Sequence, residues 1–267
     1  MQNIEMRNVS MFSTEPRCSY RKNQLGEVIC QLRFPEILTI EANAPVEFQE
    51  AIRATFPRYS SRKETPAPKL VNGRLEPQNP NNNYQFVSED GHWRVNLTST
   101  FISLACNQYT CWEDFAKMLD MPLAAFIKIY RPAFFERVGL RYLNFISRKN
   151  LGLDTIPFRD LIQPQYLGIL ADEQLPETAT ARNTVDAELA IRGGCRAKIH
   201  AGPGLVKRGG VESKEIHFIF DQDLFMLGNI AINLSAGALE TLHSQADSIF
   251  RAAITDTLHD AMEPTIL

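Results

Sequence analysis

The chain of 267 residues lacks any apolar run that approaches the ~20 residues needed to span a bilayer. Residues 1–17 lack the continuous apolar core of a secretory signal. We therefore expect a soluble protein that is located in the cytoplasm and has no membrane partner.

Cysteine pairs with metal-ligand spacing are also missing. The chain has five cysteines, and none of them forms a C-x-x-C motif. They are Cys18, Cys30, Cys106, Cys111 and Cys195. An odd number of cysteines without such a motif predicts reduced thiols that pack as small hydrophobic side chains.

The common catalytic motifs are absent as well. We find no G-x-S-x-G, H-E-x-x-H or EF-hand pattern and no P-loop. The glycine-rich segment 202–210 lacks P-loop spacing and lies between two expected strands, so it is interpreted as a flexible hairpin loop that could contact an anion through Lys207 and Arg208. These features favour a protein that is not an enzyme, without excluding one, and we expect no catalytic residue, metal or cofactor.

Composition is typical of a globular protein, with 44% hydrophobic and 22% charged residues. The formal net charge is −3, so bulk charge does not indicate a nucleic-acid partner.

The expected elements occur twice in the same order. The first half has an alternating strand at 27–34, and then a helix that follows a cap at Asn43 and ends before Pro57. A proline-rich surface loop at 57–83 separates this helix from the next elements. These are strands at 84–88, 92–98 and 101–106, and a helix at 110–130 with a Thr110–Glu113 capping box, which Pro122 kinks or divides.

The second half repeats this order. It contains a strand at 137–145, a short helix near 158–162, strands at 184–192, 195–201 and 215–220, and a long amphipathic helix at 235–260. Gly193-Gly194 marks a hairpin, and residues 202–213 are expected to form a glycine-rich loop.

The fold class expected from this order is α+β. Duplicated β-α-β-β-β-α halves at 25–131 and 132–267 would follow an irregular lead-in at 1–24 and form one pseudo-symmetric domain. Its mainly antiparallel sheet would be backed by two long helices, with an element order like that of TATA-binding-protein-like folds, whose open sheet face binds ligand.

Two segments carry a family resemblance. They are Tyr20-Arg21-Lys22-Asn23 leading into 27–34, and the stretch at 137–144, which reads RVGLRYLN. Together with the C-terminal helix, they make the chain resemble a sporadically distributed family of prokaryotic proteins of unknown function. The resemblance implies no activity, cofactor or catalytic residue. A patchy distribution is typical of mobile genes, such as defence or toxin–antitoxin components.

The polar face of the expected sheet is the candidate ligand-binding site. Its proposed members are Arg33, Arg94, Asn96, Arg141, Lys198 and His200. One interpretation is an anionic ligand, such as a phosphate, a nucleic-acid backbone or an acidic segment of a partner. The other, which we favour, is a solvated face with cross-strand ion pairs such as Glu188 with Arg196.

Arg33 and Arg141 occupy comparable positions in the two opening strands. They could line one groove, or each could pair with a carboxylate such as Glu27, Glu136 or Asp221. We favour the structural pairing.

Three functions remain open on the sequence alone. The first is a non-catalytic binding or scaffolding protein of a prokaryotic multi-component system, with a protein partner or a second copy of the chain. The second is a nucleic-acid or nucleotide-binding module that uses the basic sheet face. The third is a metal-dependent hydrolase that uses His200, His217 and Asp221, for which no complete ligand set can be placed.

Overall fold

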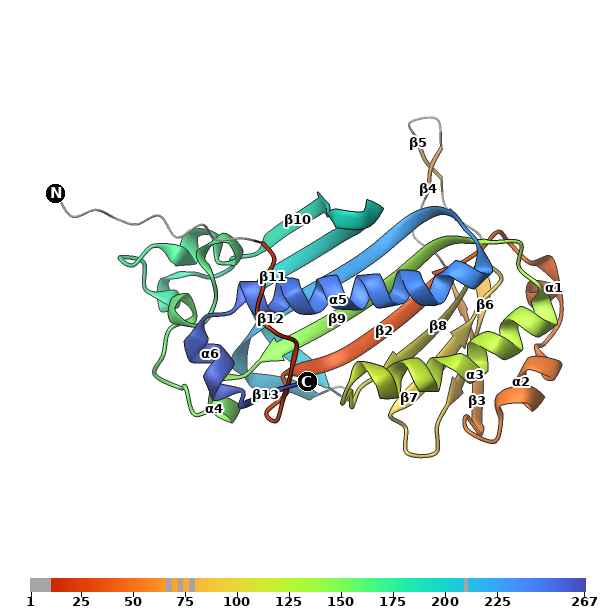
Figure 1. Cartoon of the computed structure of the whole chain (residues 1–267), viewed down its shortest axis with the longest axis horizontal. Helices are drawn as coiled ribbons and strands as arrows, with labels where there is room; N and C mark the ends of the chain where they lie inside the picture. Colours follow the sequence, from red (N-terminus) through yellow and green to blue (C-terminus); the bar gives the residue numbers. More distant parts are fainter. Residues whose placement is uncertain (1–10, 66–68, 72–73, 77–79, 209–210) are drawn as a thin grey trace. The chain divides into compact units, whose positions relative to one another are not determined.

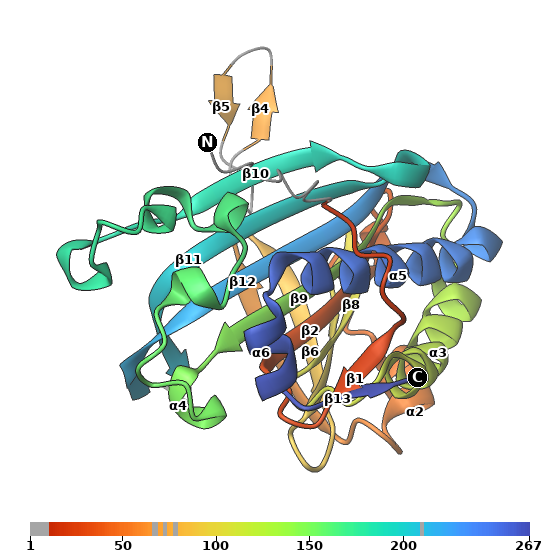
Figure 2. The same cartoon turned by 60° about the vertical axis from the view of Figure 1, so that its left-hand side comes forward.

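A computed structural model describes residues 11–65, 69–71, 74–76, 80–208 and 211–267. It confirms the α+β class with a large, mainly antiparallel sheet (Figures 1 and 2). The largest sheet has nine strands in the order β10-β11-β12-β9-β2-β8-β7-β6-β3, and the pairs β1-β13 and β4-β5 are separate. The duplication of halves and the likeness to TATA-binding-protein-like folds stay predictions.

The strands are β1 Cys18–Tyr20, β2 Leu25–Arg33, β3 Arg58–Glu64, β4 Lys69–Val71, β5 Arg74–Glu76, β6 Asn81–Val87, β7 Trp93–Leu97, β8 Phe101–Cys106, β9 Phe135–Ile146, β10 Val185–Ala190, β11 Arg196–Arg208, β12 Val211–Ile230 and β13 Pro264–Ile266. The α-helices are α1 Leu38–Ala42, α2 Val46–Ile52, α3 Trp112–Tyr130, α4 Arg148–Leu151, α5 Ser235–Ala253 and α6 Asp256–Ala261. Short 3-10 turns lie at Phe158–Asp160, Pro164–Tyr166, Gly168–Ala171, Glu177–Ala179, Arg192–Gly194 and Ile232–Leu234.

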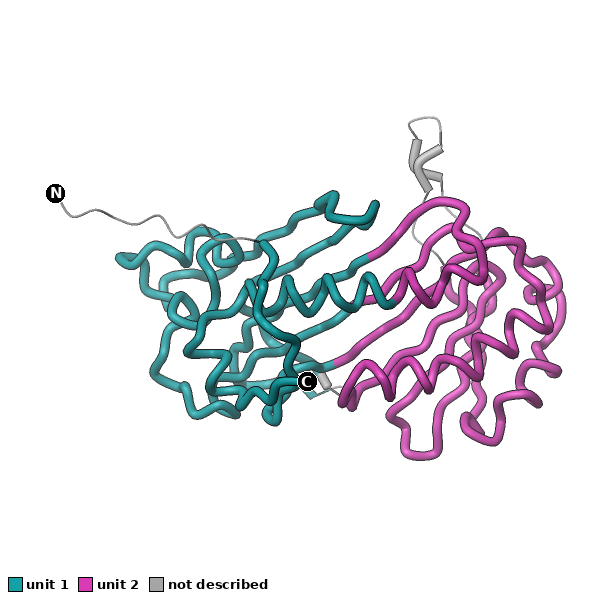
Figure 3. Tube along the Cα trace, in the orientation of Figure 1, with its two compact units in different colours: residues 1–26, 142–224, 240–267 teal, residues 27–141, 225–239 magenta. Residues whose placement is uncertain are grey.

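The chain divides into two compact units (Figure 3). Unit 1 holds residues 1–26, 142–224 and 240–267, and unit 2 holds residues 27–141 and 225–239. Each unit is built from separate stretches of the chain, and neither corresponds to one continuous half. The division into halves at 25–131 and 132–267 stays a prediction.

In unit 2 the helices pack on one face of the strands β2-β8-β7-β6-β3. Phe48 of α2 lies 5.4 Å from Phe86 of β6, and the Phe34 and Phe126 ring centroids are 4.6 Å apart. Alternation along a strand sends every second side chain to this face. Among the described residues of unit 2, the opposite face carries no helix, and we call it the helix-free face.

The segment 57–83 was expected to be a loop, and this is wrong where it is described. It contains the edge strand β3 and the β4-β5 hairpin. Pro57 and Pro80 lie just outside strands and so do not remove a ladder hydrogen bond. Side chains along β3 are mostly exposed and many are charged, a composition that discourages edge-to-edge pairing with other chains.

Both predicted helix caps in unit 2 are wrong. Helix α3 begins after Cys111, which makes no side-chain cap bond, and Thr110 Oγ1 instead donates to Asp114 Oδ2 at 2.9 Å. Helix α2 begins after Pro45 rather than Asn43. Pro122 lies within α3, which is assigned as one helix of 19 residues.

In unit 1, helix α5 packs against the strands through aromatic contacts. The ring of Phe220 on β12 lies 6.0 Å from Phe250 and 5.2 Å from Tyr166. The interface is partly polar, because the Tyr142 hydroxyl and His243 Nδ1 are 2.7 Å apart. Gln222 Nε2 donates to the Ala246 carbonyl at 3.2 Å.

The long helix predicted at 235–260 is two helices. The Ala253 carbonyl accepts from the Gln163 N–H at 2.8 Å, and the Thr255 N–H donates to Leu161 at 2.9 Å. These bonds to the 158–163 segment take the place of helical ones, so α5 ends there. Thr255 Oγ1 then caps α6 by accepting from the Leu258 N–H.

The glycine-rich loop predicted at 202–213 is mostly strand. β11 continues to Arg208 and β12 begins at Val211, while residues 209–210 lie outside the described part. A Cβ at Gly202 would lie 2.3 Å from the Asn183 carbonyl oxygen. Glycine is therefore needed at this position, where the two backbones approach each other closely.

The lead-in at 1–24 was expected to be irregular, and this is wrong for β1. Residues 1–10 lie outside the described part. β1 pairs with the C-terminal β13, with Cys18 opposite Ile266 and Tyr20 opposite Pro264. The Tyr20 hydroxyl and His259 Nδ1 are 2.9 Å apart, so this pairing is also tied to α6.

Two leucines of unit 2 give a matched test of its core. Leu104 on β8 is fully buried, whereas Leu38 at the start of α1 is 70% exposed. We expect Leu104→Ala to lower the free energy of unfolding by about 2–5 kcal/mol because it leaves a cavity. Leu38→Ala should change it by less than about 0.5 kcal/mol, measured by urea unfolding. Equal losses for the two variants would contradict this assignment of the core.

His259 makes stability depend on pH. Burial lowers the pKa of His259, and the charge of Arg251 lowers it further. Because the unfolded chain then takes up a proton at higher pH than the folded chain, this contribution is present above about pH 6.5 and is lost as the pH falls. In urea unfolding between about pH 8 and pH 5, His259→Gln should lose less stability than the wild type. Identical pH profiles would contradict this role.

Candidate functional site

The six residues proposed from the sequence fall on both units. Unit 2 holds Arg33, Arg94, Asn96 and Arg141, and unit 1 holds Lys198 and His200. The candidate surfaces are therefore described one unit at a time.

A row of uncharged polar side chains crosses the helix-free face of unit 2. Strand register places one member on each of five neighbouring strands, directly opposite the next. In order from β2 to β3 they are Gln31, Ser103, Asn96, Gln85 and Ser60. We call this set the polar row. Directly opposed residues of antiparallel strands point to the same face, about 4.8 Å apart, so the row is continuous.

The buried middle of the polar row is held by amide hydrogen bonds. Asn96 Nδ2 donates to Asn83 Oδ1 at 2.8 Å, and Asn83 Nδ2 donates to Glu64 Oε2 at 2.7 Å. Asn83 is 3% exposed and Asn96 is 8% exposed. Buried amides that are bonded in series keep their orientation, so the middle of the row, at Asn96, is fixed.

Arginines flank the polar row. Arg94 reaches across β8 to Glu27, with Nη2 2.8 Å from Oε1. Ala105 lies opposite Arg94 on β8, and its small side chain leaves room for this ion pair. Arg33 is exposed at the end of β2, and among the described residues no carboxylate lies within ion-pair distance of it. Its predicted structural pairing is therefore not found, and Glu27 pairs with Arg94 instead.

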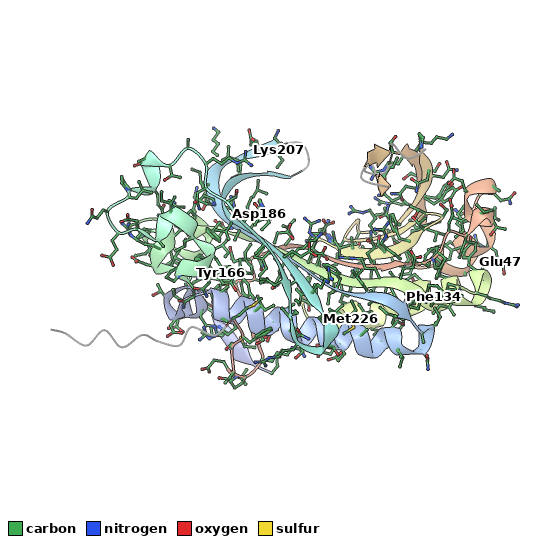
Figure 4. The ribbon with its side chains drawn as sticks, turned by 90° about the horizontal axis from the view of Figure 1, so that it is seen from above. Glu47, Phe134, Tyr166, Asp186, Lys207 and Met226 are labelled. Carbon is green, nitrogen blue, oxygen red and sulfur yellow. The ribbon has the colours of Figure 1, made fainter. Side chains whose placement is uncertain are left out.

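Lys198 and His200 of unit 1 lie opposite acidic residues of β10. His200 Nδ1 is 2.6 Å from Asp186 Oδ1, and Lys198 Nζ is 3.5 Å from Glu188 Oε2. Arg196 approaches the same Glu188 at 3.4 Å. This is the cross-strand ion pairing of the favoured interpretation. Figure 4 shows Asp186 on the side of these strands away from α5.

Arg141 lies on β9 and its side chain is exposed. It lies in unit 2, at the point where β9 passes into unit 1.

A cavity of about 350 Å³ lies within unit 1. It is lined by Asn23, Gln24, Leu25, Phe145, Asn150, Val206, Val211, Glu212, Ser213 and His217. Of these, the sequence singled out only His217, and only as a metal ligand. The lining comes from four separate segments, so no local motif could indicate it.

The cavity wall includes the His217 imidazole, and a fixed carboxylate, Glu215, lies beside that ring without being a lining residue itself. His217 Nδ1 lies 3.1 Å from the Glu215 carbonyl oxygen, and His217 Nε2 lies 3.9 Å from Glu215 Oε2. Ser147 Oγ is 2.9 Å from both carboxylate oxygens, and the Lys149 N–H donates to Oε1 at 3.1 Å. Glu215 is therefore held by the start of α4, where Ser147 is the cap.

The metal-dependent hydrolase interpretation named His200, His217 and Asp221. No group of three or more histidine, cysteine, aspartate or glutamate side chains among the described residues could hold a metal ion. Burial raises the pKa of the Cys30 thiol to about 12 and also raises the pKa values of Cys106 and Cys195. A nucleophilic cysteine needs the opposite shift.

Comparison with protein-family models and with the curated proteins finds no match for this chain. Within the described residues, no helix is both long and apolar enough to cross a membrane.

The Asn96→Ala variant tests whether the hydrogen bonds from Asn96 through Asn83 to Glu64 stabilise unit 2. Asn96→Ala leaves the buried Asn83 Oδ1 without this donor, so we expect a loss of about 1–3 kcal/mol in the free energy of unfolding. Gln85→Ala, which changes the half-exposed member opposite Asn96, should cost less than about 0.5 kcal/mol. Urea unfolding of both variants is the measurement, and an Asn96→Ala variant as stable as the wild type would contradict the network.

Proposed function

We propose that this chain is a non-catalytic binding protein that docks a protein partner on the helix-free face of unit 2. The observation that carries the proposal is the polar row. Five neighbouring strands each present one uncharged donor or acceptor at the same level of the sheet. Such a row is suited to the hydrogen-bonding groups of a partner surface.

The exposed members of the row supply the contacts. Gln31 and Gln85 are half-buried and Ser60 is exposed, while Ser103 and Asn96 form the floor between them. Because the floor is fixed by the Asn83–Asn96 bond, binding would cost little ordering of that part of the surface.

The charges on this face favour a protein partner. Arg94 is balanced by Glu27 at 2.8 Å, and Arg62 is balanced by Glu64 at 2.5 Å. The affinity of a protein for nucleic acid depends on the positive charge that it brings to the phosphate backbone. Arginines that are already paired with carboxylates add little to that charge. A neutral row between balanced ion pairs instead fits the rim-and-core pattern of protein interfaces.

The context that we propose is a prokaryotic multi-component system of the defence or toxin–antitoxin kind, in which this chain acts as a scaffold. The family resemblance of the segments at 20–34 and 137–144 supports this proposal. A second copy of the chain would also count as a protein partner.

The test is affinity capture from a prokaryotic lysate with matched variants. We expect Gln31→Ala/Gln85→Ala to recover at least about tenfold less of the partner than the wild type, because it removes the two half-buried glutamines of the row. Gln174→Ala, an exposed glutamine on unit 1, is the control and should recover the wild-type amount. Equal recovery with the double variant would contradict the proposal, and size-exclusion chromatography with light scattering shows whether the partner is a second copy.

Nucleic acid is the second candidate, and two exposed arginines favour it. Arg33 and Arg58 lie on β2 and β3, the two strands that carry the first and last members of the polar row. An arginine pair beside amides resembles a surface that positions a phosphate backbone and reads base edges. This candidate requires an affinity that falls steeply with added salt and weakens in Arg33→Ala/Arg58→Ala. Fluorescence anisotropy with single-stranded and duplex oligonucleotides measures this, and no binding at low salt would rule the candidate out.

A further inference from the structure

We propose that the unit 1 cavity is a binding site for a small ligand that carries an ammonium or guanidinium group on an apolar body. This site is separate from the polar row, and the proposal is independent of the protein partner. It rests on the hydrogen-bonding state of His217, the fixed position of Glu215, the charge of the lining and the size of the cavity.

The first step concerns the His217 ring. A carbonyl oxygen can only accept, so the 3.1 Å contact with the Glu215 carbonyl requires Nδ1 to carry the proton. In the neutral ring, Nε2 is then an acceptor. It lies 3.9 Å from Glu215 Oε2, another acceptor, at a distance too long for a direct hydrogen bond.

A single donor group placed between or beside these two acceptors can bond to both of them. An ammonium group has three N–H donors and a guanidinium has five, so either can bond to both atoms at once. Hydrogen bonds from a charged donor to a carboxylate are among the strongest in proteins. A ligand with one such group therefore satisfies both Nε2 and the carboxylate.

The second step is that Glu215 is already oriented. Ser147 is 1% exposed, and its hydroxyl lies 2.9 Å from each carboxylate oxygen. The Lys149 N–H adds a further bond at 3.1 Å. These contacts fix the carboxylate before any ligand arrives, which lowers the entropic cost of binding.

The third step is the charge of the lining. Among the lining residues that the structure describes, Glu212 is charged and none is a lysine or an arginine. Lys207 approaches Glu212 only at 4.0 Å, at exposed positions where the pair is screened by solvent. A cationic group therefore meets favourable charge in the cavity, and an anionic group does not.

The fourth step is the size and the apolar part of the wall. Leu25, Phe145, Val206 and Val211 contribute apolar side chains beside the polar ones. A volume of about 350 Å³ is at the small end of ligand pockets. This fits a single aliphatic or aromatic amine, or one lysine or arginine side chain of a peptide.

The test uses 2-phenylethylammonium and its uncharged counterpart 2-phenylethanol as probes, measured by calorimetry at neutral pH. We expect the ammonium to bind at least about tenfold more tightly than the alcohol, because only the ammonium can pair with the carboxylate. A third probe, a capped tripeptide with a central lysine, distinguishes a free amine from a peptide side chain as the source of the group.

The variants locate the binding. Glu215→Gln removes the charge but keeps acceptor capacity toward Ser147, and Val211→Arg adds a cation at a residue that is 74% exposed. Each should weaken binding of the ammonium by at least about tenfold. His217→Gln removes the ring Nε2 acceptor and should also weaken binding of the ammonium. His200→Gln, on the neighbouring strand and paired with Asp186, is its matched control and should bind as the wild type does.

Thermal unfolding of each variant checks that it is folded. If the alcohol binds as well as the ammonium, or if Val211→Arg remains folded and binds normally, the proposal is overturned. Failure of all three probes to bind the wild type would overturn it as well.

Discussion

Strand register is the constraint on which the rest of unit 2 depends. In antiparallel pairs the residues directly opposite each other share a face, and a slip of one residue exchanges the two faces. The register that places Leu104 opposite Cys30 and Val95 builds the core beneath α2 and α3. The same register places Ser103 between Gln31 and Asn96, so the core and the polar row are two consequences of one pairing. The large apolar area on the other face therefore fixes the position of the row.

In unit 1 the position of the cavity depends on how strands and short helices are joined. The start of α4 holds the Glu215 carboxylate through Ser147. Strand β12 carries both Glu215 and His217. The bonds from residues 161–163 to the end of α5 are what separate it from α6. Both features depend on contacts between segments far apart in the sequence, and both are made by backbone groups or short side chains.

This explains which parts could be predicted from the sequence. The strand at 101–106 and the α3 stretch were found because their apolar periodicity is strong and local. The α5–α6 break was missed because apolar periodicity continues through Ile254, while backbone bonds to another segment end the helix. β3 was missed because a polar edge strand has no apolar alternation to detect. The polar row could be found only with the strand register, although the alternation of Gln85 with the apolar Tyr84 and Phe86 was visible in the chain. His217 was noticed, and Glu215 lies two residues away on the same strand. Ser147, which holds the Glu215 carboxylate, and the apolar lining residues come from segments that the sequence cannot place together.

The central claim is that the helix-free face of unit 2 is the binding surface, and site-specific photo-cross-linking tests it most directly. A photoreactive residue is introduced at Gln31 in one protein and, as a control, at the exposed Glu173 of unit 1 in another. Both are irradiated in a prokaryotic lysate and the adducts are identified. Our account predicts one defined polypeptide adduct from position 31 and none of that mass from position 173. The same adduct from both positions, or only nuclease-sensitive adducts from position 31, would contradict it.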